Sequence, residues 1–157
     1  MAIIVEDGTV VAGANSYVTE SALIAYALDR GIALNIEASQ LLIRAMDWIE
    51  VQKYKGDQVT TDQVLQWPRA NVADKIYSVI YSDVIPAQLK AQQMYVATGI
   101  DQGFDPAGYH EQGIESETNC LGDKVTYLSG ALDHYAPSTT ANRFNELLRP
   151  RFKSYRV

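Results

Sequence analysis

The sequence predicts a mainly α-helical protein, a small bundle of about four helices with short extended segments at both ends. Apolar residues recur at helical spacing in several separate stretches, and residues that start or stop helices bound these stretches. At 157 residues, with 47% apolar and 20% charged residues, the chain has the size and composition of one globular domain. We therefore expect a single helical domain over residues 1–149, followed by a projecting C-terminal tail over residues 150–157.

Two helices are expected in the first third of the chain. Thr19 is a suitable N-cap and Gly31 a suitable C′ residue for a helix near residues 20–30. The second helix is predicted from Glu37 to about Tyr54, with Gly56 beyond its end. Its apolar stripe follows the i, i+3, i+4, i+7 rule through Leu42, Ala45, Met46 and Ile49.

Two further helices are expected later in the chain. Pro86 suits the first turn of a helix over residues 86–101, because a backbone N–H in the first turn has no partner within the helix and proline loses nothing by lacking it. A last helix, capped by Thr140 and ended by Pro150, carries Phe144 and Leu147 on one face.

The remaining segments lack a helical pattern. Residues 3–5 and 10–11 flank an Asp-Gly turn signal, which predicts a small hairpin or a hooked extended arm. Residues 57–83 are turn-rich, and we expect a loop there that is anchored by a buried Trp67. Residues 115–119 and 124–128 could pair as a β-hairpin near residues 112–128.

Charge is distributed unevenly along the chain. The net charge is -6, yet residues 141–157 hold five Lys and Arg against one Glu, and residues 1–140 hold eight against eighteen Asp and Glu. Such an acidic body would repel a phosphate backbone, so DNA binding over the whole surface is not expected. The absence of a long apolar run or a leader predicts no membrane segment, and a single cysteine, Cys120, fits synthesis in a reducing cytoplasm.

The residue types that would support catalysis are not arranged for it. No Gly-rich phosphate loop is present. His110, Glu111 and His134 could be imagined as zinc ligands and Cys120 as a nucleophile, but no spacing orders them. The acidic pairs Asp101 with Asp105 and Glu115 with Glu117 lack the pattern of a calcium loop. We therefore predict that the protein is not an enzyme and has no catalytic, cofactor-binding or metal-binding residues.

Three parts of the sequence carry a resemblance to a known family. These parts are residues 4–9 with 12–18 (IVEDGT and AGANSYV), residues 65–69 (LQWPR) and residues 85–92 (IPAQLKAQ). In this order they resemble a family of small phage proteins encoded among head and neck components. Its members are often labelled DnaT-like single-stranded-DNA-binding proteins and are similar to head-to-tail connector (head-completion adaptor) subunits. The resemblance covers roughly residues 3–100.

The resemblance implies a structural virion protein that forms a ring, usually twelvefold, under the portal. Its implied partners are other copies of itself, the portal protein, a downstream neck or tail protein, and passing genomic double-stranded DNA that it does not read by sequence. Its implied place is the neck of the virion, after assembly in the host cytoplasm. The alternative is a DnaT-like replication accessory that binds single-stranded DNA.

Two sets of site residues are expected, and the first follows from this resemblance. The C-terminal segment commonly reaches the portal in such rings, and its expected contact residues here are Arg149, Arg151, Phe152, Lys153, Tyr155, Arg156 and Val157. Cations and aromatic side chains in this segment suit an acidic partner. The second set, Trp67, Pro68 and Arg69, is expected either to anchor its own loop or to contact a neighbouring subunit.

Overall fold

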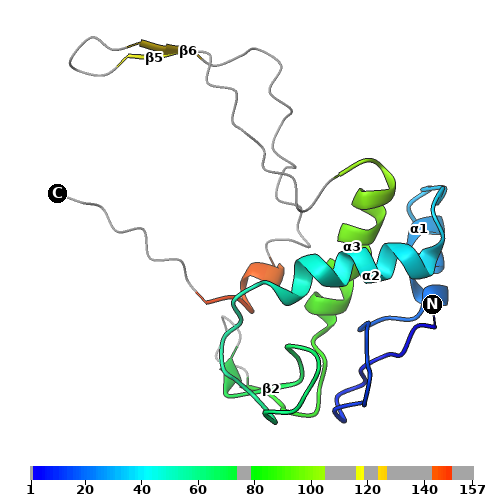
Figure 1. The fold of residues 1–157 in the computed structure, drawn as a ribbon, viewed down its shortest axis with the longest axis vertical. Helices are drawn as coiled ribbons and strands as arrows, with labels where there is room; N and C mark the ends of the chain where they lie inside the picture. The colour runs from blue at the N-terminus through cyan, green and yellow to red at the C-terminus, as the bar shows by residue number, and fades with distance from the viewer. Residues whose placement is uncertain (1, 74–78, 105–115, 119–123, 127–142, 150–157) are drawn as a thin grey trace.

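The computed structural model describes residues 2–73, 79–104, 116–118, 124–126 and 143–149 (Figure 1). Three helices form the body: α1 (Glu20–Leu28), α2 (Ala38–Glu50) and α3 (Ala87–Asp101). A further short helical turn covers residues 143–145. The expected mainly helical small domain is thus confirmed at this level. None of the described helices is long and apolar enough to cross a membrane.

The ends of α1 and the start of α3 lie at the capping residues that the sequence indicates. The Thr19 side chain accepts a hydrogen bond from the Ala22 amide at 3.1 Å, which satisfies an otherwise unpaired donor of the first turn. Gly31 adopts the left-handed conformation (φ +66°) after α1, as the sequence predicts. Pro86 is the N-cap of α3, one position before the expected first turn.

Helix α2 is shorter than the sequence predicts. It ends at Glu50 instead of near Tyr54, and Val51 is its C-cap. The reason is a long-range contact: Tyr54 forms an isolated antiparallel β-bridge with Leu148, which requires extended backbone. The Tyr54 hydroxyl also donates to the Ile49 carbonyl at 3.0 Å, so this side chain folds back over the end of α2.

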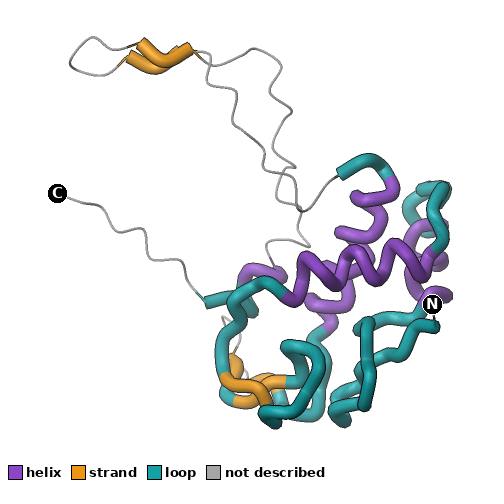
Figure 2. Tube along the Cα trace, viewed as in Figure 1, coloured by secondary structure: helices purple, strands orange, loops and turns teal. Residues whose placement is uncertain are grey.

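In the described part of the chain, six short strands form three antiparallel pairs. β1 (Asp57–Gln58) pairs with β2 (Arg69–Ala70), β3 (Val72–Ala73) with β4 (Val79–Ile80), and β5 (Ser116–Thr118) with β6 (Lys124–Thr126). The pair β5–β6 lies within the hairpin expected near residues 112–128. The pairs β1–β2 and β3–β4 lie in the segment that the sequence predicts as loop. The sequence does not indicate them because two-residue strands are too short to show an alternating pattern. Figure 2 shows β1–β2 and β3–β4 among the loops of the body, on one side of the helices.

The N-terminal arm is hooked, but its expected pairing between residues 3–5 and 10–11 is not formed. Val5 instead bridges Ser16 in parallel, and the Glu6 amide donates to the Ser16 carbonyl at 2.8 Å. The buried Glu6 carboxylate accepts hydrogen bonds from the amides of Gly8, Val10 and Val11 at 2.7 to 3.0 Å. Because these donors are used by Glu6, residues 10–11 cannot offer them to a partner strand.

The core of the described body consists of two clusters of apolar side chains. The helical cluster joins all three helices and contains Val18, Leu23, Ala38, Leu41, Leu42, Ala45, Val96, Ala97 and Ile100. The aromatic cluster lies at the other end of α2 and contains Ala14, Tyr17, Met46, Ile49, Tyr54, Leu65, Trp67, Val72, Ile85, Leu89, Phe144 and Leu147. The buried members of the helical cluster all lie within residues 18–100, whereas the aromatic cluster also contains Phe144 and Leu147.

Candidate partner-binding surface at the C-terminal exit

The segment 143–149 is built into the core of the body. Phe144 and Leu147 are fully buried, with exposed fractions of 1% and 0%. The Phe144 ring lies 5.9 Å from the ring of Trp48 and 6.0 Å from that of Tyr54, the latter in an edge-to-face arrangement that aromatic pairs favour. The residues that directly precede the predicted tail are therefore held by apolar burial.

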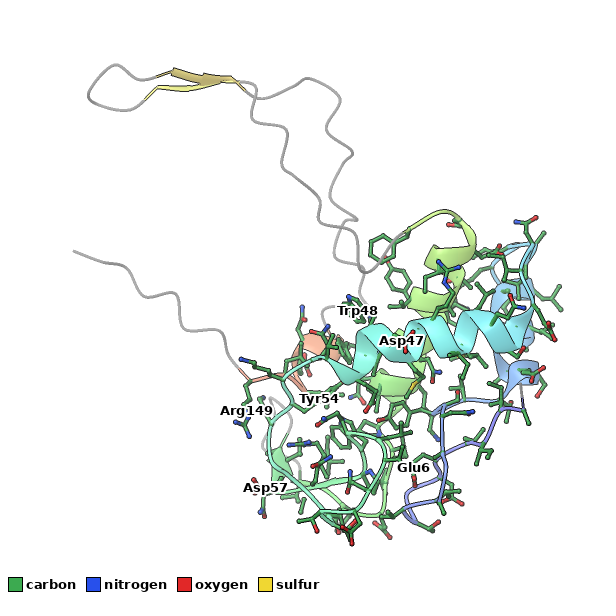
Figure 3. All side chains as sticks on the ribbon, viewed as in Figure 1. Glu6, Asp47, Trp48, Tyr54, Asp57 and Arg149 are labelled. Carbon is green, nitrogen blue, oxygen red and sulfur yellow. The ribbon has the colours of Figure 1, made fainter. Side chains whose placement is uncertain are left out.

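Backbone pairing between residues 53–55 and 147–149 fixes the end of this segment. The Lys55 amide donates to the Leu147 carbonyl at 2.9 Å, and the Arg149 amide donates to the Lys53 carbonyl at 2.8 Å. The Arg149 Nε also donates to the Tyr54 carbonyl at 2.8 Å. Figure 3 shows Arg149 beside Tyr54, above Asp57. The position of Arg149 is thus defined by the backbone of residues 53–55.

The Trp67-Pro68-Arg69 element packs against residues 54–56. Trp67 is completely buried, and its ring meets the edge of Tyr54 at 5.9 Å. The Arg69 guanidinium donates to the carbonyls of Lys55 and Gly56, each at 2.8 Å. It also reaches the Gln66 carbonyl at 3.2 Å. Arg69 therefore holds the outer face of the segment that pairs with the C-terminal residues.

A cluster of cations surrounds this point. Arg69 and Arg149 both donate to the Gly56 carbonyl, at 2.8 and 3.5 Å. Burial, and then the nearby Arg149 charge, lowers the pKa of Arg69, although a guanidinium still remains protonated in proteins. We call Lys53, Lys55 and Arg149 the exit surface; Arg69 is buried next to it. Lys53 and Arg149 are exposed, so the exit surface can bind an anionic or acidic partner.

A buried polar network supports the exit surface from inside. The Tyr17 hydroxyl donates to the Glu50 carboxylate at 2.7 Å and accepts from the Trp67 amide at 3.1 Å. The Gln66 amide donates to the other Glu50 oxygen at 2.7 Å. Burial raises the pKa of Glu50, while the Tyr17 and Gln66 hydrogen bonds oppose the rise. The network ties α2 to the loop that carries Trp67, and its contacts are structural.

The site residues expected from the sequence are placed only in part. Arg149 lies at the exit, and Trp67 and Arg69 are enclosed by their own chain. Arg151, Phe152, Lys153, Tyr155, Arg156 and Val157 lie outside the described residues. Sequence reasoning missed Lys53 and Lys55, since nothing local indicates that residues 53–55 pair with residues 147–149.

The candidates considered for metal binding are also placed only in part. Within the described part of the chain, no group of three His, Cys, Asp or Glu residues could hold a metal ion. His110, Glu111, Cys120 and His134 lie outside that part. The Asp101 carboxylate accepts from the amides of Asn35 and Ile36 at 2.9 and 2.8 Å, which holds the α1–α2 loop.

The described residues thus define a small helical protein whose candidate site is a basic binding surface. Comparison with protein families gives the more particular assignment. A family model described as "Putative DnaT-like ssDNA binding protein" matches residues 1–154, and the chain therefore belongs to this family. No match was found among curated proteins or among solved structures.

Proposed function

We propose that this protein is a structural, non-catalytic head-to-tail connector subunit of a tailed-phage particle. In this role it forms a ring under the portal, completes the head, lets DNA pass and docks the neck or tail. The observation that carries the proposal is the fixed position of residues 143–149. Buried Phe144 and Leu147, together with the pairing of residues 53–55, hold Arg149 at one defined point, and the basic segment 150–157 follows it in the sequence. A short segment presented in this way suits insertion into a neighbouring protein.

The charge of the body supports the same role. Residues 2–73 and 79–104 hold eleven Asp and Glu against six Lys and Arg. A wall with this excess of negative charge repels phosphate, so double-stranded DNA can slide past it without sequence-specific binding. The cations of the exit surface and of residues 150–157 are instead placed where an acidic partner would complement them.

A second candidate function is binding of single-stranded DNA as a replication accessory. The description of the family favours this function directly. The exit surface supplies cations for phosphate contacts, and Phe152 and Tyr155 are aromatic residues of the kind on which bases stack. Both candidates use the same end of the molecule, so one pair of measurements can separate them.

The first measurement is the mass of the complex formed with the portal protein of the same phage, by native mass spectrometry or light scattering. Three chains are compared: the full chain, a chain that ends at residue 149, and a full-length chain with Arg151→Gln, Lys153→Gln and Arg156→Gln. The second measurement is the fluorescence anisotropy of labelled oligothymidylate with the same chains, at roughly 50 and 200 mM salt.

The connector function predicts a complex with the portal that is lost on truncation and weakened by the glutamine substitutions. It also predicts little binding of the oligonucleotide. Salt-sensitive oligonucleotide binding that the glutamine substitutions abolish, with no portal complex, would overturn the proposal in favour of the DNA-binding function.

A further inference from the structure

The two ends of the described body carry opposite charges. We call the first the α1 end; its charged groups are Glu20, Asp29, Arg30, Glu37 and Asp101, with a net charge of -3. The other is the exit end, which has a net charge of +2; its charged groups are Lys53, Lys55, Arg69, Arg143 and Arg149 with Glu50, Asp57 and Glu146. Figure 3 shows Arg149 and Tyr54 at the opposite side from α1, with α2 running between the two ends. The thirteen residues of α2 span about 20 Å.

Each end also exposes apolar side chains. Leu28 is 72% exposed, and Ile24, one turn earlier on the same face of α1, is 46% exposed. At the exit end Val51, the C-cap of α2, is also 72% exposed and lies two residues before Lys53. The two ends thus match in apolar character and are complementary in charge.

A purely local explanation covers only part of this pattern. An acid at the start of a helix and a base beyond its end both stabilise the helix dipole, which accounts for Glu37 and Lys53 on α2. It does not account for the exposure of Leu28 and Val51. It also does not explain Arg149, which is brought to this end by long-range pairing.

We propose that a second copy of this chain docks head to tail, with the α1 end of one copy against the exit end of the next. The two patches differ, so the contact is heterologous, and repeated copies close into a ring or extend as a filament. The inference rests on the proposed function, since it names the surfaces through which the proposed ring would form. Complementary charges align the two ends, and Ile24, Leu28 and Val51 lose water on docking.

The experiment uses two variants that each block one end. Leu28→Asp places a carboxylate on the acidic α1 end, and Val51→Asp with Lys53→Glu makes the exit end acidic. Val84→Asp is the matched control, because Val84 is 44% exposed but lies beside Gly8, at neither end. The mass of the protein alone is measured by sedimentation velocity for each variant and for an equimolar mixture of the two blocked variants.

We expect the wild type and the Val84→Asp control to form oligomers and each blocked variant to be a monomer. The mixture should form dimers and nothing larger, because the Leu28→Asp chain keeps its exit end and the other variant keeps its α1 end. Dimer formation also shows that both variants are folded. The wild-type oligomer should weaken as salt rises from about 0.1 to 1 M, over which the Debye length falls from roughly 10 to 3 Å.

A monomeric wild type, a mixture that stays monomeric, blocked variants that still assemble, or a control that dissociates would each overturn the inference. These results are independent of the portal measurement. If the portal complex forms but the chain alone fails these tests, only the head-to-tail contact is wrong. If the chain assembles as expected but never binds the portal, the connector function is wrong while the contact stands.

Discussion

Gly56→Ala is expected to destabilise the protein much more than Gly31→Ala, although the two glycines have almost the same backbone conformation. Their φ angles are +65° and +66°, a region that costs an L-residue about 1–2 kcal/mol. A Cβ atom on Gly31 would meet nothing within 4 Å, whereas one on Gly56 would lie 2.1 Å from the Ala70 carbonyl oxygen and 2.7 Å from Val72 Cγ2. Gly31→Ala therefore measures the backbone cost alone.

The Gly56 variant adds a steric cost to the backbone cost. Overpacking against fixed neighbours adds about 1–3 kcal/mol, so Gly56→Ala should lower the free energy of unfolding by roughly 2–5 kcal/mol in total. Urea unfolding, followed by the fluorescence of Trp48 and Trp67, measures both variants against the wild type. Equal losses for the two variants would refute the reasoning, because they would show that Gly56 is not packed against Ala70 and Val72.

Three further predictions concern buried groups. Phe144→Ala should lower the free energy of unfolding by about 3–5 kcal/mol, since it empties the space beside Trp48 and Tyr54; a loss below about 1 kcal/mol in urea unfolding would mean that residues 143–149 are not part of the core. Glu6→Ala should destabilise the protein by several kcal/mol, because three backbone amides lose their hydrogen-bond acceptor, at a cost of about 1–3 kcal/mol each. Unchanged rates of amide hydrogen exchange at residues 8–11 would contradict this prediction. Burial raises the pKa of Glu50, so the folded state binds its proton more tightly than the unfolded state. The stability gained in this way is fully present below the ordinary glutamate pKa of 4.5 and is lost as pH rises through the folded pKa. The difference in unfolding free energy between wild type and Glu50→Gln should therefore change across that window, and a constant difference would count against it.

Helix positions could be read from the sequence because their signals are local. Thr19 and Gly31 bound α1 as predicted, and the stripe through Leu42 and Ile49 lies in α2. The end of α2 could not be predicted. Residues 51–54 continue an acceptable helical pattern, and only the bridge from Tyr54 to Leu148 makes extended backbone preferable.

The candidate site was visible in part. The excess of cations near the C-terminus indicates Arg149 as a contact residue, and the Trp67-Pro68-Arg69 element predicts a buried anchor. The contribution of Lys53 and Lys55 depends on which distant segment pairs with them, and a single sequence contains no local signal for such pairing. The roles of residues 151–157 stay predictions, because they lie outside the described residues.

The position of the aromatic cluster in the chain has a consequence for synthesis. The helical cluster can close as soon as residues up to Ile100 are available, but the aromatic cluster requires Phe144 and Leu147. The contact between Arg149 and Tyr54 spans 95 residues, so it closes a long loop that has to be ordered late. A growing chain therefore cannot complete this core before Leu147 has been synthesised. Arg149 therefore reaches its place beside Tyr54 only in chains whose aromatic cluster can already close.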